Sequence, residues 1–201
     1  EEKGGGYDLI EVDVCIRENG QMDVTHDEDT TFGLDIVPYF AYLHQHPEKR
    51  MWMDIKNLDE ENKEPFFVCL DSLCRTYEIA RERLIVETPR WDLMRLLTIH
   101  DFCTSYYVDA PKPSELTRRQ MDSVITRLDR VASSGCVRAL SFPGWWYMAL
   151  RGQYKERDIS FLIWKHRSIQ WEVFLCPEGK MMLADDRVKA ILVKDKGRYH
   201  R

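Results

Sequence analysis

Short apolar runs of strand-forming residues alternate with longer, helix-compatible segments along most of this chain. Such alternation is typical of βαβ units, in which helices join parallel strands. The sequence predicts seven strands, at residues 9–16, 51–55, 84–87, 103–108, 138–142, 160–164 and 190–193. We therefore expect an α/β fold built on a parallel sheet.

The segments between these strands are predicted to form helices over residues 37–46, 65–80, 90–100, 114–134 and 145–154. The helix at 114–134 is the clearest, because its apolar residues recur at helical spacing, Ser114 can cap its start and Gly135 can end it. Residues 171–175 fit either an extra strand or an irregular crossover. With no linker or low-complexity tract in the sequence, residues 1–201 are expected to form a single domain.

The predicted parallel strands suit a TIM-type (β/α) barrel, although they are one short of a closed one. A complete barrel of this kind has eight strands and typically needs about 250 residues, whereas this chain has 201. The sequence opens with a glycine run a few residues before its first predicted strand. We expect a barrel whose first βα unit is missing or not recorded, and an open sheet is the alternative.

Composition excludes some partners and leaves other questions open. The 29 basic and 34 acidic residues give a formal charge of -5, so the positive field that binds nucleic acid is lacking. No apolar run is long enough to span a membrane. The six cysteines have no zinc-binding spacing and are expected to be buried free thiols. Oligomeric state stays open, and so does the compartment, which is cytoplasmic or reached by export after loss of a signal before position 1.

Two pairs of polar residues alternate along the first two predicted strands. Glu11 and Asp13 are separated by one residue and therefore face the same side of their strand, as do Asp54 and Lys56 on theirs. Inward-facing carboxylates repel one another and lose hydration unless a cation lies between them. We therefore expect Glu11, Asp13 and Asp54 to bind Mg²⁺ or Ca²⁺. Lys56 is then a fixed positive charge beside the ion, or a counter-ion for Asp54 alone.

A histidine follows the turn after the first predicted strand. His26 and its neighbour Asp27 lie in the segment 24–27. A metal ion, a lysine and a histidine together suit phosphoryl transfer, because the cations neutralise the phosphate oxygens and the imidazole moves a proton. We expect His26 to be the general acid or base, while Asp27 either supports it or caps a turn.

Further contacts are expected near the C-terminal ends of the strands, where parallel barrels place their active sites. Glu87 ends the third predicted strand and is expected to be another ligand or a polar contact to the substrate. Tyr107 and Trp145 follow later strands in dense aromatic stretches. They either pack against the barrel rim or form an apolar wall for a lipid or sugar group.

Residues 7–27 resemble a segment of the glycerophosphodiester phosphodiesterase family in which an E-x-D strand, a turn with glycine and an H-D pair follow one another. Asp54-Ile55-Lys56 resembles the family's E-x-K strand with Asp for Glu, a variant similar to the sphingomyelinase D branch of the superfamily. Residues 161–164 resemble the strand whose tryptophan, here Trp164, flanks the substrate. Residues 190–195 resemble the closing strand, ordinarily written G-I-x-T-D.

The resemblance implies a barrel with a divalent-metal site that acts on glycerophosphodiesters or related (lyso)phospholipid headgroups, by hydrolysis or by forming a cyclic phosphate. Family members also carry an earlier strand with H-R-G and then an E-N-T motif, and neither occurs here. The H-R-G histidine is one of two that exchange protons with the substrate. His166, beyond Trp164, is the only other histidine expected near the same rim. The alternative is therefore a catalytically impaired barrel that acts as a binding or scaffold protein.

Overall fold

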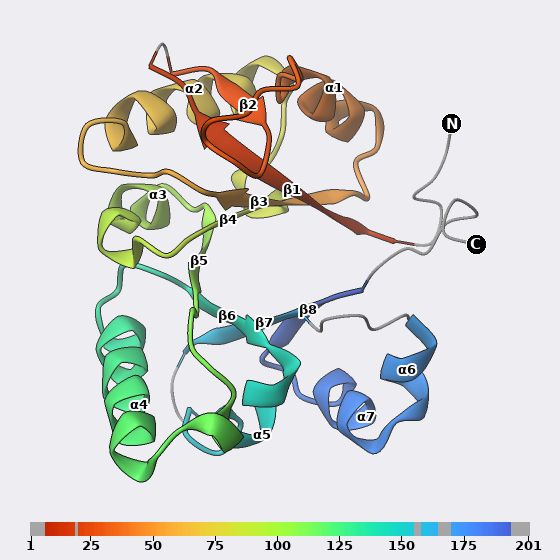
Figure 1. Cartoon of the computed structure of the whole chain (residues 1–201). Helices are drawn as coiled ribbons and strands as arrows, with labels where there is room; N and C mark the ends of the chain where they lie inside the picture. Colours follow the sequence, from red (N-terminus) through yellow and green to blue (C-terminus); the bar gives the residue numbers. More distant parts are fainter. Residues whose placement is uncertain (1–6, 19, 155–157, 165–169, 194–201) are drawn as a thin grey trace. The chain divides into compact units, whose positions relative to one another are not determined.

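The structure is a computed structural model, and it describes residues 7–18, 20–154, 158–164 and 170–193 (Figure 1). The chain divides into two compact units, the first made of residues 1–106 and 135–137 and the second of residues 107–134 and 138–201. A single domain over residues 1–201 stays a prediction.

Most of the first unit is a sheet with helices on one face (Figure 1). Its strands are β1 (Leu9–Ile16), β2 (Met22–Val24), β3 (Arg50–Ile55), β4 (Leu84–Thr88) and β5 (Cys103–Tyr107). They pair in the order β2-β1-β3-β4-β5, with β2 antiparallel to β1 and the other pairs parallel. The helices are α1 (Val37–Gln45), α2 (Lys63–Thr76), α3 (Arg95–Ile99), η1 (Arg81–Arg83) and η2 (Trp91–Leu93).

One row of residues across this sheet identifies its helix-covered face. Val12, Met53, Val86 and Thr104 are successive register partners on β1, β3, β4 and β5, and all are buried. The Thr104 hydroxyl lies 2.6 Å from the hydroxyl of Thr98 on α3, so this row points toward the helices. Because side chains alternate along a strand, residues one position further along point to the opposite face.

The second unit contains three parallel strands and four α-helices in its described part. β6 (Ala139–Pro143), β7 (Ser160–Trp164) and β8 (Val188–Leu192) pair in that order. The helices are α4 (Arg118–Ser133), α5 (Tyr147–Leu150), α6 (Gln170–Leu175), α7 (Pro177–Leu183), η3 (Pro113–Glu115) and η4 (Gly144–Trp146). A Cβ at Gly179 would lie 2.0 Å from the Val173 carbonyl oxygen, so the close packing of α7 on α6 requires glycine there.

The α/β class and all seven predicted strand positions are confirmed. The hairpin strand β2 was not predicted, because three residues are too few for a periodic pattern. Gly20 makes its turn with a φ of 76°. A closed barrel and a missing first βα unit stay predictions.

Several helix predictions were wrong in their limits. The helix predicted at 114–134 begins at Arg118, because Thr117 and Gln120 form a capping box, whereas Ser114 lies in η3. Residues 90–100 form η2 followed by the short α3, and residues 145–154 contain only η4 and α5. Residues 171–175, expected as a strand or crossover, belong to helix α6.

Two expectations from composition can be compared with the structure. All six cysteines are free, but only Cys15 and Cys74 are fully buried, so the prediction of buried thiols was too broad. Among the described residues, no helix has the length and apolar character needed to cross a membrane.

Candidate active site

Three carboxylates from neighbouring strands meet on the face of the first unit's sheet that is opposite the helices. Asp13 on β1 is the register partner of Asp54 on β3, and Asp54 is the partner of Glu87 on β4. Glu11 lies two residues before Asp13 and therefore on the same face. One ligand oxygen from each of Glu11, Asp13 and Asp54 lies within 4.8 Å of the others. The structure thus brings together the three predicted metal ligands.

The charge of this cluster changes the proton affinity of Glu11. Loss of hydration, followed by repulsion from Asp13 and Asp54, raises the pKa of Glu11 from 4.5 to about 7. Glu11 is nevertheless an exposed residue. The repulsion is therefore the firmer cause, because it depends only on how close the carboxylates lie. The three carboxylates lie within 4.8 Å of one another, so their negative charges oppose ionisation of Glu11.

A Glu11→Gln variant, without metal, is expected to lose part of the pH dependence of folding stability between pH 4.5 and about 7. The folded protein binds the Glu11 proton more tightly than the unfolded chain does, so this carboxyl makes stability fall as pH rises through that window. Glutamine does not titrate, and the fall should become smaller. Urea unfolding in EDTA below, within and above the window measures the effect. Identical pH slopes for the two proteins would refute it.

Lys56 neutralises part of the cluster. Its Nζ donates to Asp54 Oδ2 at 2.5 Å and to Asp13 Oδ1 at 2.7 Å, so it is not a counter-ion for Asp54 alone. Although burial opposes the charge, these two hydrogen bonds hold the pKa of Lys56 above its ordinary value. Burial raises the pKa of Asp54 while Lys56 lowers it. We expect this pair to be ionised at neutral pH, because the lysine contacts two carboxylates at once.

The three acids fit a hard divalent cation. Their ligands are all oxygens, which Mg²⁺ and Ca²⁺ prefer, and two oxygens on opposite sides of a Ca²⁺ ion lie about 4.6 to 5.2 Å apart. A mutual separation within 4.8 Å is compatible with that geometry. One ammonium group against three carboxylates also leaves net negative charge for a metal to neutralise. That these residues bind a metal stays a prediction.

A Lys56→Met variant is expected to be destabilised without metal and to gain more stability from Ca²⁺ than the wild type. The loss should be about 1 to 3 kcal/mol, less than for a fully buried pair because the Asp13 side chain is 33% exposed. The stability gained from Ca²⁺ should be larger in the variant than in the wild type, because the ion then replaces the missing positive charge of Lys56. Urea unfolding in EDTA and in CaCl₂ measures both quantities.

Lys63→Met is the matched control, since Lys63 pairs with Glu60 at the surface and its loss should change neither quantity. A Lys56 variant as stable as the wild type in EDTA would show that the lysine does not compensate the carboxylates.

His26 lies in the loop that follows β2. Its Nδ1 is 2.8 Å from Asp27 Oδ1, and the two side chains are 71% and 72% exposed. The charge of the imidazole lowers the pKa of both Glu11 and Asp54, so His26 lies within electrostatic range of the cluster. When Nδ1–H donates to Asp27, Nε2 is left to accept or return a proton. The arrangement thus fits the predicted acid/base role and the supporting role of Asp27.

The other predicted contacts divide between the two units. Glu87 is 2% exposed and lies in the same row as Asp54. In the second unit, the rings of Tyr107 and Trp164 stack with centroids 5.7 Å apart, and Trp145 meets Trp164 edge-on at 6.1 Å. Lys112, which sequence reasoning missed, places Nζ 5.4 Å from the Trp145 ring centroid. His166 lies outside the described residues.

Sequence reasoning also missed Arg17, which follows the last residue of β1 and contacts the His26 loop. A signal was available. Asn followed by Gly at positions 19 and 20 is a strong sequence signal for a hairpin turn, and a hairpin brings Arg17 back toward residues 22–24.

Neither family models nor curated proteins match the sequence. Solved structures do. A glycerophosphodiester phosphodiesterase from Parabacteroides distasonis aligns over 91% of this chain and 78% of its own, with a TM-score of 0.59 at 13% identity. A protein assigned to the glycerophosphoryl diester phosphodiesterases, from Silicibacter pomeroyi, aligns over 94% and 81%, with a TM-score of 0.61 at 14% identity.

A third structure, from Galdieria sulphuraria and assigned to the glycerophosphodiester phosphodiesterases, aligns over 92% of this chain and 81% of its own, with a TM-score of 0.58 at 12% identity. The chain has the fold of these phosphodiesterases. At such low identity the likeness concerns the fold alone, so activity must be argued from the site. The sphingomyelinase D branch stays a prediction.

Proposed function

We propose that this chain is a divalent-metal-dependent phosphodiesterase that acts on glycerophosphodiesters or related (lyso)phospholipid headgroups. The observation that carries the proposal is the meeting of Glu11, Asp13 and Asp54 within 4.8 Å, beside Lys56, which directly follows β3. The likeness of the fold to glycerophosphodiester phosphodiesterases supports it. A metal ion held by oxygen ligands and a neighbouring lysine both attract the negative oxygens of a phosphate diester, so the site favours such a substrate over a neutral one.

In this proposal Glu11, Asp13 and Asp54 hold the cation, Mg²⁺ or Ca²⁺. Bound there, a divalent ion supplies positive charge to the non-bridging phosphate oxygens. Lys56 adds a second positive charge once it releases one of its two aspartates, and so stabilises the charge that develops in the transition state. Glu87, Tyr107, Trp145 and Trp164 stay proposed contacts to the rest of the substrate.

His26 is the proposed proton carrier. Asp27 holds Nδ1, and Nε2 either takes a proton from the attacking hydroxyl or returns one to the departing alcohol. The attacking group is water, which gives a linear monoester, or a neighbouring hydroxyl of the substrate, which gives a cyclic phosphate. In both cases the P–O bond to the alcohol breaks as the new P–O bond forms.

The second candidate is a catalytically impaired barrel that binds a phosphodiester or acts as a scaffold. One observation favours it: the His26 side chain is 71% exposed, so water competes for the proton that the enzyme proposal assigns to it. Binding without turnover separates this candidate from the enzyme.

A product assay tests the proposal. The full chain is incubated with glycerophosphocholine, glycerophosphoethanolamine or lysophosphatidylcholine in Mg²⁺ or Ca²⁺, and ³¹P NMR separates linear from cyclic products. We expect turnover of at least one substrate, and loss of turnover in EDTA. No product from any of them would count against the enzyme, and calorimetric binding of the same diesters without product would favour the second candidate.

A further inference from the structure

Arg17 joins the strand that carries two of the carboxylates to the loop that carries His26. It follows directly on β1, whose residues include Glu11 and Asp13. Its Nη1 donates to the Glu28 carbonyl oxygen at 2.5 Å, and its Nη2 donates to the Thr30 carbonyl oxygen at 2.7 Å. A single guanidinium thus holds the loop two and four residues beyond the imidazole.

The guanidinium is itself fixed in place. Asp23 on β2 is 5% exposed, and its Oδ2 accepts from Arg17 Nε at 3.2 Å and from Arg17 Nη2 at 2.7 Å. A hydrogen bond from Thr31, followed by those from Arg17, holds the pKa of Asp23 below its ordinary value. Asp23 is therefore ionised at neutral pH and anchors the arginine by a charge-assisted hydrogen bond.

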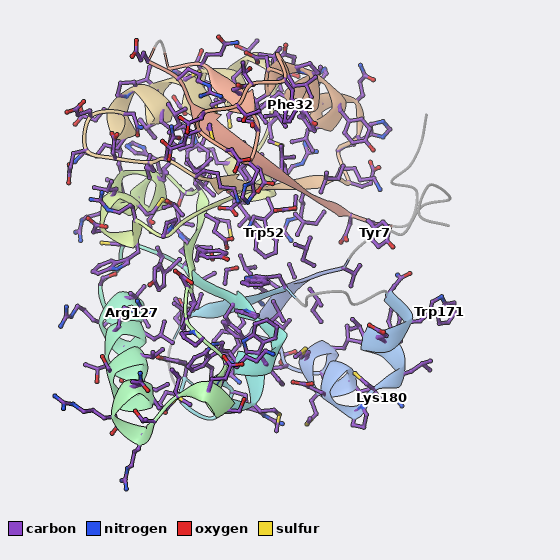
Figure 2. All side chains as sticks on the ribbon, in the orientation of Figure 1. Tyr7, Phe32, Trp52, Arg127, Trp171 and Lys180 are labelled. Carbon is purple, nitrogen blue, oxygen red and sulfur yellow. The ribbon has the colours of Figure 1, made fainter. Side chains whose placement is uncertain are left out.

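Hydrogen bonds rather than apolar packing fix the shape of the loop, and besides Arg17 they include the one from Thr31 to Asp23. Residues 26–29 and 31–34 are exposed, and the largest apolar side chain among them, Phe32, is 70% exposed at the surface of the first unit (Figure 2). Backbone pairing of Val24 with Leu34 closes the ends of the loop. Inside it, the Thr30 amide donates to the Asp27 carbonyl at 3.1 Å. A loop without apolar burial depends on its hydrogen bonds for order, and Arg17 supplies two of them from outside the loop.

We propose that Arg17 is a positioning residue, which sets the place of the His26 imidazole relative to the carboxylates of β1. The inference rests on the proposed function, since it gives the loop a catalytic purpose. A planar guanidinium can hold Asp23 and two carbonyl groups at once, because its donors form a rigid fork. A lysine offers one compact ammonium group and cannot span the three partners.

The test is Arg17→Lys in the full chain. We expect faster amide hydrogen exchange across residues 25–34, and kcat lower by roughly 10- to 100-fold, since small misplacement of a catalytic group costs on that order. KM and Ca²⁺ affinity should change less than about twofold, because the carboxylates and Lys56 stay in place. A purely structural arginine would not separate kcat from KM in this way.

Arg83→Lys is the matched control. Arg83 is also half-buried and donates to the carbonyls of Leu43, His46 and Lys49 at 2.7 to 2.9 Å, away from the His26 loop. The Arg83→Lys substitution should lower thermal stability without changing amide hydrogen exchange in residues 25–34 or kcat. Asp23→Asn is a milder second variant, which weakens the anchor but leaves the arginine, and it should give a smaller change in the same direction.

Unchanged exchange of the loop in Arg17→Lys would overturn the inference, and so would faster exchange with unchanged kcat. If the wild type turns over no diester, the proposed function fails. Positioning is then judged by exchange and by the imidazole ¹H signals of His26. Those signals should broaden or shift in Arg17→Lys and stay unchanged in Arg83→Lys. Unaltered His26 signals in both variants would again overturn it.

Discussion

An Asp54→Asn variant is expected to lose at least about 100-fold in Ca²⁺ affinity and as much in turnover. Residues that merely orient a metal ligand contribute about 10- to 100-fold, so removal of a ligand should cost more. The fold should persist, because Lys56 keeps Asp13 as a partner at 2.7 Å and burial already opposes the charge of Asp54. Calorimetric titration with Ca²⁺ and the product assay measure the two losses.

Asp71→Asn is the matched control for this experiment. Asp71 is as buried as Asp54, at 8% exposure, and also pairs with cations, since Arg75 Nη2 lies 2.6 Å from its carboxylate and Arg81 contacts it as well. Its replacement should lower stability while leaving Ca²⁺ affinity unchanged. Equal Ca²⁺ affinity for Asp54→Asn and the wild type would show that Asp54 is not a ligand.

A His26→Gln variant is expected to lower kcat by about 100- to 10,000-fold, the usual contribution of a positioned acid or base. Glutamine keeps hydrogen-bonding groups but cannot carry a proton at neutral pH. Ca²⁺ affinity and KM should change little, because the His26 side chain is exposed and pairs with Asp27. Steady-state kinetics with the best diester substrate separate these quantities.

His44→Gln controls for the general effect of losing a histidine. His44 lies on α1, is exposed, and bonds the Tyr77 carbonyl at 2.8 Å. The His44→Gln substitution should leave kcat unchanged. If His26→Gln turned over substrate at the wild-type rate, His26 would not carry the proton, and a histidine elsewhere in the chain would have to be sought.

The strands and the carboxylate cluster were predictable from local patterns. Apolar runs such as residues 51–55 and 84–87 have the length and composition of buried parallel strands. The spacing of Glu11 and Asp13 fixed their shared face, because strand side chains alternate. The direct pairing of Asp13 with Asp54 could not be predicted, since register depends on how neighbouring strands slide during packing.

Less of the helical structure and of the supporting contacts was predictable. Residues 171–175 form a helix in which Val173 is buried while Trp171 is 69% exposed and lies at the outer surface (Figure 2). Such a short apolar run fits both helical and strand periodicity. The double contact of Lys56 with Asp13 and Asp54 and the reach of Arg17 into the His26 loop are tertiary contacts. No spacing along the chain specifies them.

A crystal structure of the full chain grown with CaCl₂ would show whether the three carboxylates bind a metal ion. We expect one Ca²⁺ ion with oxygens of Glu11, Asp13 and Asp54 at about 2.3 to 2.6 Å, and Lys56 released from at least one aspartate. Ca²⁺ bound elsewhere, with Lys56 still between Asp13 and Asp54, would contradict this expectation.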